Sequence, residues 1–394
     1  MNNLTFSPTR HKLAQAVALG ILSMAASSVQ ATNYTFSDLG TFSGAYAGTN
    51  SFFTAINNLG QVGGNSVVSP GDVATQAYVW NGGARTQLDG MPGQVAGAGN
   101  QVLGMNNVGQ IVGMNTDVAG DVLTAVLWDG TTATALEDGG RGGAFGINDL
   151  GQSAGAYWQA TNHWAAARWD AGSTTPTILN GLGGLDWEAL SINNAGQAVG
   201  PAFTTDGAAM HAALWNNTTT AIDLGTLGGT NSWANQINNV GQVAGWAVLA
   251  DDATQHAALW NPGSAAVDLG SLGGTSEAMA INSTGLIVGD SFLADGTTQH
   301  ATLWNGIGIV DLNSYLSPEL IAAGWVMVQA TGINDNGAII GWAENTNLPH
   351  AYWLVDGSFV LTPTAVPVPG AVWLFGSALA GFMGMKRRKN GQSA

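Results

Sequence analysis

A seven-fold internal repeat is the feature that most limits how this 394-residue chain can fold. Each unit carries the phrase Ile-Asn-x-x-Gly, with Met in place of Ile in the second unit, and successive asparagines are 49, 42, 45, 45, 44 and 52 residues apart. An apolar run ending in glycine follows each phrase, and a tryptophan stands about 12 to 16 residues later. The asparagines are Asn57, Asn106, Asn148, Asn193, Asn238, Asn282 and Asn334, and the tryptophans are Trp80, Trp128, Trp169, Trp215, Trp260, Trp304 and Trp353.

Each unit contains four short strand-like runs separated by turns, because Asn and Gly adopt positive φ at little cost. Four strands in about 45 residues is the pattern of a propeller blade. The tryptophan would fill the space between blades. We therefore predict an all-β, seven-bladed β-propeller over residues 32–363. Crowding of the inner strands around one axis would explain why the residue before Ile or Met is very small in six of seven units: Ala55, Gly104, Gly146, Ser191, Gln236, Ala280 and Gly332.

Such a ring has to be closed, because an unpaired edge strand invites aggregation. The segment 34–40 precedes the first unit, and Phe359-Val360-Leu361 follows the last. Each looks like a spare outer strand, and either could complete the seventh blade. An open solenoid is the alternative, although no segment resembles a capping repeat.

The N-terminal residues 1–31 have the pattern of a signal peptide removed by signal peptidase. Arg10, His11 and Lys12 precede an apolar run from Leu13 to Met24, and a small-x-small cleavage site ends at Ala31. A buried N-terminal helix is the alternative.

Residues 364–394 have the pattern of a sorting tail. A Pro motif precedes a 371–385 apolar stretch that is just long enough to be a transmembrane helix across a thin bilayer, and the basic cluster after it would stay cytoplasmic. The tail resembles the PEP-CTERM signal of Gram-negative bacteria in its VPxP variant, which implies recognition and removal by an exosortase-type enzyme. A permanent membrane anchor is the alternative. The residues that carry this resemblance are Val366, Pro367, Pro369, Lys386, Arg387, Arg388 and Lys389.

Charge and composition exclude several function classes. The net charge is −16, and residues 32–370 hold three basic residues against all 25 acidic ones, so this body repels phosphate backbones and nucleic-acid binding is excluded. With no cysteine, the chain has no disulfide, no thiolate metal site and no cysteine nucleophile.

The best-preserved units resemble the HAF family of extracellular repeats. One unit runs from Asp223 through Asn238 and Gly241 to His256 and Trp260, and the next repeats it from Asp268 to Trp304. The resemblance covers roughly residues 38 to 354 and implies secretion and architecture but no reaction.

Recurring histidines and acidic loop residues are the two candidate kinds of cation ligand in the sequence. The recurring histidines lie on different blades, so we expect each to satisfy a backbone group of its own blade rather than share a metal. Calcium is the one cofactor that the sequence leaves open, with Asp251-Asp252 and Asp290…Asp295 as oxygen donors. No other cofactor is expected, and solvated loop acids are the alternative. The histidines are His211, His256, His300 and His350.

Tryptophans that do not belong to the repeat position suggest a ligand-binding face. Trp187 and Trp233 stand in corresponding loops near Glu188 and Asn231, and flat rings beside polar groups suit a sugar. Inter-blade packing is the alternative for this pair.

We expect a non-enzymatic binding or matrix protein that is exported across the inner membrane, anchored there transiently and delivered to the cell surface or exterior. PEP-CTERM-type proteins as a class are associated with extracellular polysaccharide, so the resemblance favours that partner. A purely structural surface module is one alternative. A glycan-processing enzyme that uses Asp186 and Glu188 is another.

Overall fold

The computed structural model describes residues 33–39, 51–67, 75–94, 98–116, 122–136, 140–347 and 357–364. Residues 35–362 form one compact unit. The predicted signal peptide and the sorting motif with its apolar stretch lie outside the described residues. Among the residues that are described, no helix is long and apolar enough to cross a membrane.

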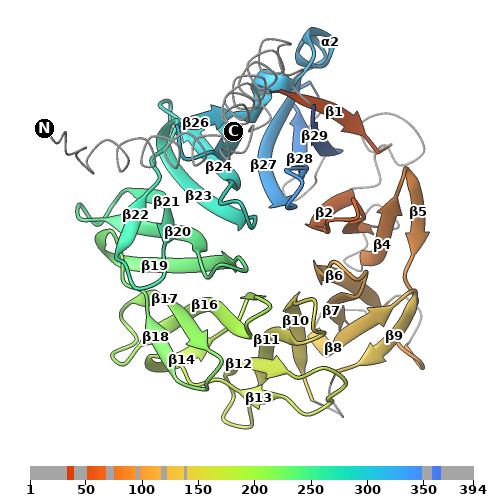
Figure 1. The fold of residues 1–394 in the computed structure, drawn as a ribbon, viewed down its shortest axis with the longest axis vertical. Coiled ribbons are helices and arrows are strands. Elements are labelled where there is room, and N and C mark those ends of the chain that lie inside the picture. Colours follow the sequence, from red (N-terminus) through yellow and green to blue (C-terminus); the bar gives the residue numbers. More distant parts are fainter. Residues whose placement is uncertain are drawn as a thin grey trace, which may run out of the picture. The chain divides into compact units, whose positions relative to one another are not determined.

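Seven antiparallel sheets make up the described part of this unit, and Figure 1 shows them arranged around a central axis as the blades of a propeller. Blade 1 contains β2 (Ser51–Ile56), β3 (Val62–Val67), β4 (Thr75–Asn81) and β5 (Ala84–Gln87). Blade 2 contains β6 (Gly99–Met105), β7 (Ile111–Thr116), β8 (Val122–Asp129) and β9 (Thr132–Ala135). Blade 3 contains β10 (Gly142–Ile147), β11 (Ser153–Trp158), β12 (Trp164–Trp169) and β13 (Thr177–Ile178).

In blade 4 the inner strand is divided into β14 (Gly183–Trp187) and β15 (Ser191–Ile192), followed by β16 (Gln197–Thr204), β17 (Met210–Asn216) and β18 (Ala221–Asp223). Blade 5 contains β19 (Gly228–Ile237), β20 (Val243–Leu249), β21 (Gln255–Trp260) and β22 (Ala266–Asp268). Blade 6 contains β23 (Gly273–Ile281), β24 (Ile287–Leu293), β25 (Gln299–Trp304) and β26 (Ile309–Asp311). The short helices η1 (Leu312–Tyr315) and α2 (Pro318–Ala322) lead into blade 7.

Blade 7 closes the ring by pairing the two ends of the propeller. Its strands are β27 (Trp325–Ile333), β28 (Ile339–Asn345), β29 (Gly357–Pro363) and, outermost, β1 (Tyr34–Asp38). Both spare segments are therefore used. The N-terminal one is the closing outer strand, whereas the segment around Val360 was wrongly expected as an outer strand and is the third strand.

This pairing also corrects the assignment of the seventh repeat tryptophan. Leu361 lies opposite Ile339, just as Trp260 lies opposite Val243 in blade 5. Leu361 thus holds the position that the repeat predicted for Trp353, which itself lies outside the described residues. Short apolar runs of equal length offer no periodicity that tells such alternatives apart.

The other six repeat tryptophans fill the interfaces between blades, as predicted. Each is at most 3% exposed. The indole of Trp128 donates a 2.9 Å hydrogen bond to the carbonyl of Asp89 beyond the outer strand of blade 1. Trp215 donates equivalently to Asn180 beyond blade 3, at 2.8 Å. At six of the seven interfaces one large ring therefore packs between two sheets, which at the two interfaces flanking blade 4 otherwise meet mainly through alanines.

A closed circle of hydrogen bonds joins the seven repeat asparagines. In each blade the side-chain amide of this asparagine donates to the backbone carbonyl of the equivalent asparagine in the next blade, at 2.9–3.2 Å. The last of these bonds runs from Asn334 back to Asn57. The same side chains accept from backbone amides of their own turns, and all seven are nearly inaccessible to solvent. We name these residues the asparagine ring: Asn57, Asn106, Asn148, Asn193, Asn238, Asn282 and Asn334.

Close packing of the inner strands around the central axis accounts for the glycines and small residues of the repeat. Each inner strand apart from the divided one has a bulge, such as the one between Ala234 and Gln236. A side chain at Gly245 on the neighbouring strand would overlap the carbonyl oxygen of Trp233. At Gly104 a Cβ would lie 2.7 Å from a carbonyl oxygen of the next blade.

We expect Asn193→Ala to lower the free energy of unfolding by about 1 to 3 kcal/mol, because it leaves the backbone amides of Ala195 and Gln197 without their acceptor and removes the bond to the carbonyl of Asn238. Urea unfolding would measure the change. Asn180→Ala is the matched control, since that side chain is exposed, and should change stability by no more than about 0.5 kcal/mol. Equal effects of the two variants would contradict the importance of the ring.

Candidate ligand-binding site

The two predicted ligand tryptophans do not form one platform. Trp187 lies opposite Ala202 in blade 4, and the equivalent pair in blade 5 is Ser232 with Ala247. Trp233 is therefore one position further along its strand than Trp187. Since successive side chains of a strand point to opposite faces, the two indoles face different neighbours.

Trp187 faces blade 3 and is fully engaged there. Its indole NH donates to the carbonyl of Leu179, and the ring packs against the core cluster between blades 3 and 4. Gly181 lies against the indole, where a Cβ would come within 2.8 Å of the ring. The His163 ring approaches at a centroid distance of 5.3 Å. These contacts match the packing alternative.

Trp233 stacks on Trp246 of the same blade, with ring centroids 6.2 Å apart and an angle of 13° between the rings. Asn231 has a structural partner: its side-chain oxygen accepts a 2.9 Å hydrogen bond from the backbone amide of Met210 in blade 4. Asp186 accepts from the amide of Trp164 in the same way, at 2.8 Å. Two of the polar groups near the predicted face are thus used to join blades.

Half-buried carboxyl groups occur at one register position in blades 4 and 6. Burial raises the pKa of Glu188, and the charge on Asp186 adds to the rise. In blade 6 Glu277 lies directly opposite Asp290 on β24. Burial and, to a smaller extent, the charge on Asp290 together raise the pKa of Glu277 to about 7, against a hydrogen bond from Asn235 that acts to lower it.

Asp290 also has a raised pKa because it is buried, although hydrogen bonds from Gln329 and Gln299 oppose the rise. Gln329 accepts in turn from the Trp342 indole at 3.0 Å. This chain of polar contacts crosses from blade 5 to blade 7. The sequence showed the carboxyl groups but not this pairing, because Glu277 and Asp290 meet only through the strand register.

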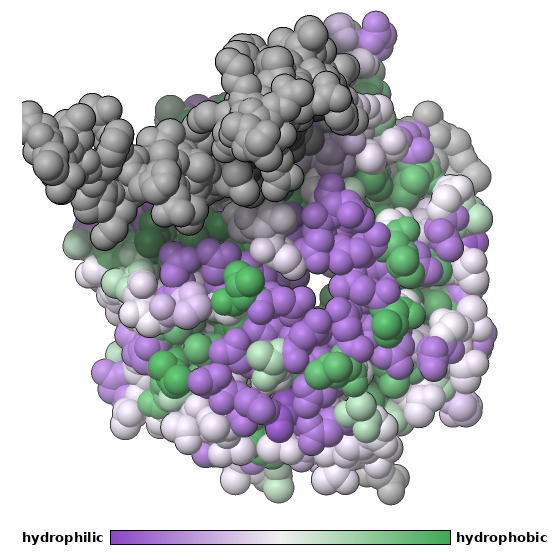
Figure 2. Space-filling view, viewed as in Figure 1, coloured by the Kyte–Doolittle hydropathy of each residue, from purple (hydrophilic) through white to green (hydrophobic). Residues whose placement is uncertain are grey.

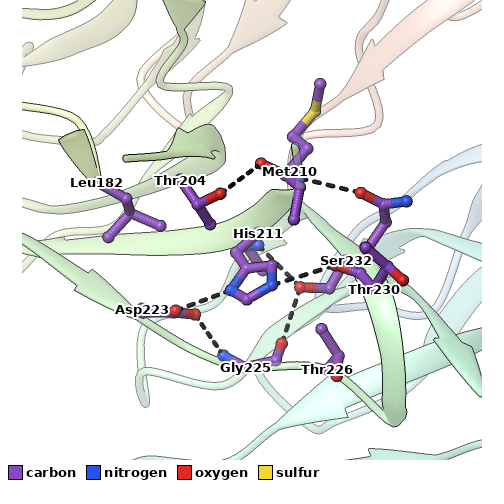
Figure 3. A network of polar contacts seen from close by, with 12 residues as sticks. Leu182, Thr204, Met210, His211, Asp223, Gly225, Thr226, Thr230 and Ser232 are labelled. Atoms are coloured by element: carbon purple, nitrogen blue, oxygen red, sulfur yellow. Dashed lines mark hydrogen bonds and ion pairs between the residues drawn. The ribbon is translucent and has the colours of Figure 1, made fainter. Parts of the chain in front are cut away.

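The histidines join strands and blades. His211 Nδ1 lies 2.8 Å from Asp223 on the outer strand of its own blade, and Nε2 lies 3.2 Å from the carbonyl of Thr230 in the next blade. Figure 3 shows the imidazole between these groups, with Ser232 bridging to Gly225. The partner within the blade is therefore a carboxylate, not the backbone group that we expected.

His256 and His300 repeat the pairing with Asp268 and Asp311, at 2.9 and 2.7 Å. His350 lies outside the described residues. Within the described ranges, no group of three or more His, Asp or Glu side chains is placed to hold a metal.

The predicted calcium donors are occupied by local turns or lie apart. Asp251 accepts from the amides of Ala253 and Thr254, which with the Thr254 hydroxyl lower its pKa to about 2. Asp252 accepts from Thr230 of the inner strand at 2.7 Å. Asp290 is buried in β24, whereas Asp295 accepts hydrogen bonds in the turn beyond it. The two proposed donor pairs therefore do not converge.

A cleft of about 600 Å³ opens between blades 5 and 6, at the ends of the strands opposite the asparagine ring. Phe292 of β24 supplies an aromatic ring, and His256 is held in place by Asp268. Thr254 is fixed by its bond to Asp251, at 2.6 Å. The cleft is lined by Ala253, Thr254, His256, Ser271, Gly273, Gly274, Thr275, Phe292 and Gly296.

This lining combines one apolar ring with hydroxyl groups, an imidazole and the backbone of three glycines, and the described residues that form it include no Asp, Glu, Lys or Arg. The volume lies in the range of small-ligand sites. The sequence had one signal for the cleft, the change from Val248 in blade 5 to Phe292 at the equivalent position of blade 6.

No protein-family model and no curated protein matches this chain. TolB from Acinetobacter baumannii is similar at 11% identity and a TM-score of 0.41, over 67% of this chain and 61% of TolB. A puromycin-hydrolyzing peptidase of Mycobacterium tuberculosis is similar at 12% identity and a TM-score of 0.47, over 80% of this chain and 53% of the peptidase. The lectin SapL1, solved with alpha methyl fucoside, has 16% identity and a TM-score of 0.36, over 69% of this chain and 98% of the lectin.

Likenesses this distant carry no inference about function, and the propeller architecture rests on the seven sheets described above. The chain spans less than two thirds of TolB and of the peptidase.

The raised pKa of Glu277 predicts a pH-dependent stability. Folding favours the protonated form of Glu277, so the contribution of this group to the free energy of unfolding is complete below about pH 4.5. The contribution falls as the pH rises and is gone above about 7, which lowers the free energy of unfolding by an amount on the order of 3 kcal/mol. Glu277→Gln should flatten the dependence in this window, as measured by urea unfolding at a series of pH values. Glu319→Gln is the control, because the pKa of that exposed residue is lowered and its contribution changes below pH 4.5. A Glu277→Gln profile parallel to that of the wild type would contradict the assignment.

Proposed function

We propose that this chain is a non-catalytic binding module of the cell exterior, and that its ligand is an extracellular polysaccharide. The observation that carries the proposal is the cleft between blades 5 and 6. A sugar ring presents an apolar face and a rim of hydroxyl groups, which correspond to Phe292 and to the threonine, serine and imidazole groups of the lining.

The charge of the protein narrows the class of polysaccharide. The net charge of −16 repels polyanions, and the described residues of the cleft lining include no lysine or arginine to offset that repulsion. The ligand is therefore a neutral polysaccharide rather than an acidic one.

Export belongs to the same proposal. Residues 1–31 direct the chain to signal peptidase, and the motif around Pro367 and Pro369 with the basic cluster 386–389 directs it to an exosortase-type enzyme in a Gram-negative cell. The HAF resemblance supports the same location. Pulse-labelling of the tagged chain would show two successive losses of mass, and a tail that persists on the mature protein would favour the permanent anchor.

We expect the purified protein to bind the host's neutral extracellular polysaccharide saturably in a glycan-panel assay, and Phe292→Ala to weaken that binding at least about ten-fold. Phe203→Ala is the matched control, because Phe203 holds the same register position in blade 4 but does not line the cleft. Chelator should leave binding unchanged, given that Asp251 and Asp252 are already hydrogen-bonded.

Three outcomes distinguish the alternatives. Binding lost on Trp187→Ala plus Trp233→Ala but kept in Phe292→Ala would move the site to the face first suggested by the tryptophans. Release of new reducing ends that is abolished by Asp186→Asn plus Glu188→Gln would make the protein a glycan-processing enzyme. Absence of all glycan binding would leave the purely structural role.

A further inference from the structure

The turns of the asparagine ring surround the mouth of the central channel. A cavity of about 270 Å³ opens there, lined by all seven inner strands and their turns. Figure 2 shows hydrophilic residues around the central opening and separate hydrophobic residues outside them. This face lies at the opposite ends of the strands from the polysaccharide cleft, and nothing in the proposed function uses it.

Two carboxylates stand on the mouth, in blades 3 and 7. Asp149 accepts from the backbone of Asn107 at 2.8 Å and from the side chain of Asn194 at 3.0 Å. Asp335 accepts from the backbone of Ser283 at 2.8 Å and from the side chain of Asn58 at 2.8 Å. Although partial burial acts to raise it, the pKa of each is lowered by these hydrogen bonds.

Within the described ranges, neither charge is paired with a cationic side chain. Every donor to Asp149 and Asp335 named above is a neutral amide, and the described residues include no basic side chain paired with either carboxylate. The charge of Asp149 acts to raise the pKa of Asp335. The mouth is therefore a focus of negative potential on an already acidic protein.

Aliphatic side chains surround this focus at a single position of the repeated turn. Leu59, Val108, Leu150 and Val240 each stand two residues after a ring asparagine, and they are 67%, 65%, 63% and 61% exposed. The turn fixes them there, because the asparagine side chain accepts from the backbone amide of Leu59, and equivalently of Leu150 and Val240, at 3.1–3.2 Å. We name these four residues the apolar crown.

Single exposed aliphatic residues are ordinary, but a set repeated around one opening marks an interaction surface. We propose that the apolar crown and the two mouth carboxylates bind a cationic, aliphatic polypeptide segment of a partner protein. Its aliphatic side chains cover the crown, and a lysine or arginine neutralises Asp149 and Asp335. The negative charge of this face favours a cationic partner over a second copy of the same face, because the second copy would bring like charges together at the mouth.

The test uses the full chain and fluorescent peptides of alternating leucine and lysine, with glycine–lysine and leucine–glutamate peptides as probes of charge and apolarity alone. Fluorescence anisotropy should show saturable binding of the leucine–lysine peptide only. Changing the four crown residues together to serine should weaken binding more than about ten-fold. Asp149→Asn plus Asp335→Asn should weaken it and reduce its salt dependence.

A matched control changes three exposed aliphatic residues outside this face, Leu185, Ile222 and Val267, to serine, and should leave binding unchanged. Equal binding of the glycine–lysine peptide, or equal binding by the crown variant, would overturn the proposal. Dimers that dissociate when the crown is changed would assign the face to a second copy, and loss of polysaccharide binding in the crown variant would assign it to the glycan.

Discussion

The propeller depends on a hydrogen bond that each repeat asparagine donates to the next blade. Blades otherwise meet through aliphatic side chains, indoles at six interfaces and scattered polar bridges, which differ from one interface to the next. The asparagine bond is the same at every interface and fixes the height of one blade against the next, because it joins identical positions of successive turns. At about 1 kcal/mol net for each bond, the circle contributes roughly 7 kcal/mol, which is comparable to the whole net stability of a typical domain.

Local features of the fold could be predicted from the sequence, and pairings across the chain could not. The turns, the small inner residues and the tryptophans follow from propensity and volume, which act within one unit. The closing order of β29 and β1 does not, because two short apolar segments compete for equivalent places. The candidate site shows the same limit: Trp187 and Trp233 lie in corresponding segments, but an offset of one residue turns them to different faces. The carboxylate partner of His211 is likewise visible only once β17 and β18 are paired.

The two ends of the blades are constrained differently. At the mouth of the channel, every turn is tied to its neighbours, so its backbone cannot change without disturbing the circle, and only outward positions such as that of Leu59 are free to vary. At the opposite end, the loops are held one pair of blades at a time, for example by Asp252 with Thr230. A change such as valine to phenylalanine can therefore reshape one inter-blade cleft without affecting the other six.

The pairing of β1 with β29 determines when the protein can be complete. Strand β1 emerges before every other strand of the propeller during synthesis, but its partner strand ends at Pro363. The N-terminal strand must therefore remain without a partner while the other blades are made, and the last bond of the asparagine ring, from Asn334 to Asn57, waits equally long. Blade formation can proceed in order along the chain, whereas ring closure is a single late event of high sequence separation and hence slow. Until then the chain exposes two unpaired strand edges, which is the interval in which it is most open to misassembly with other copies of itself.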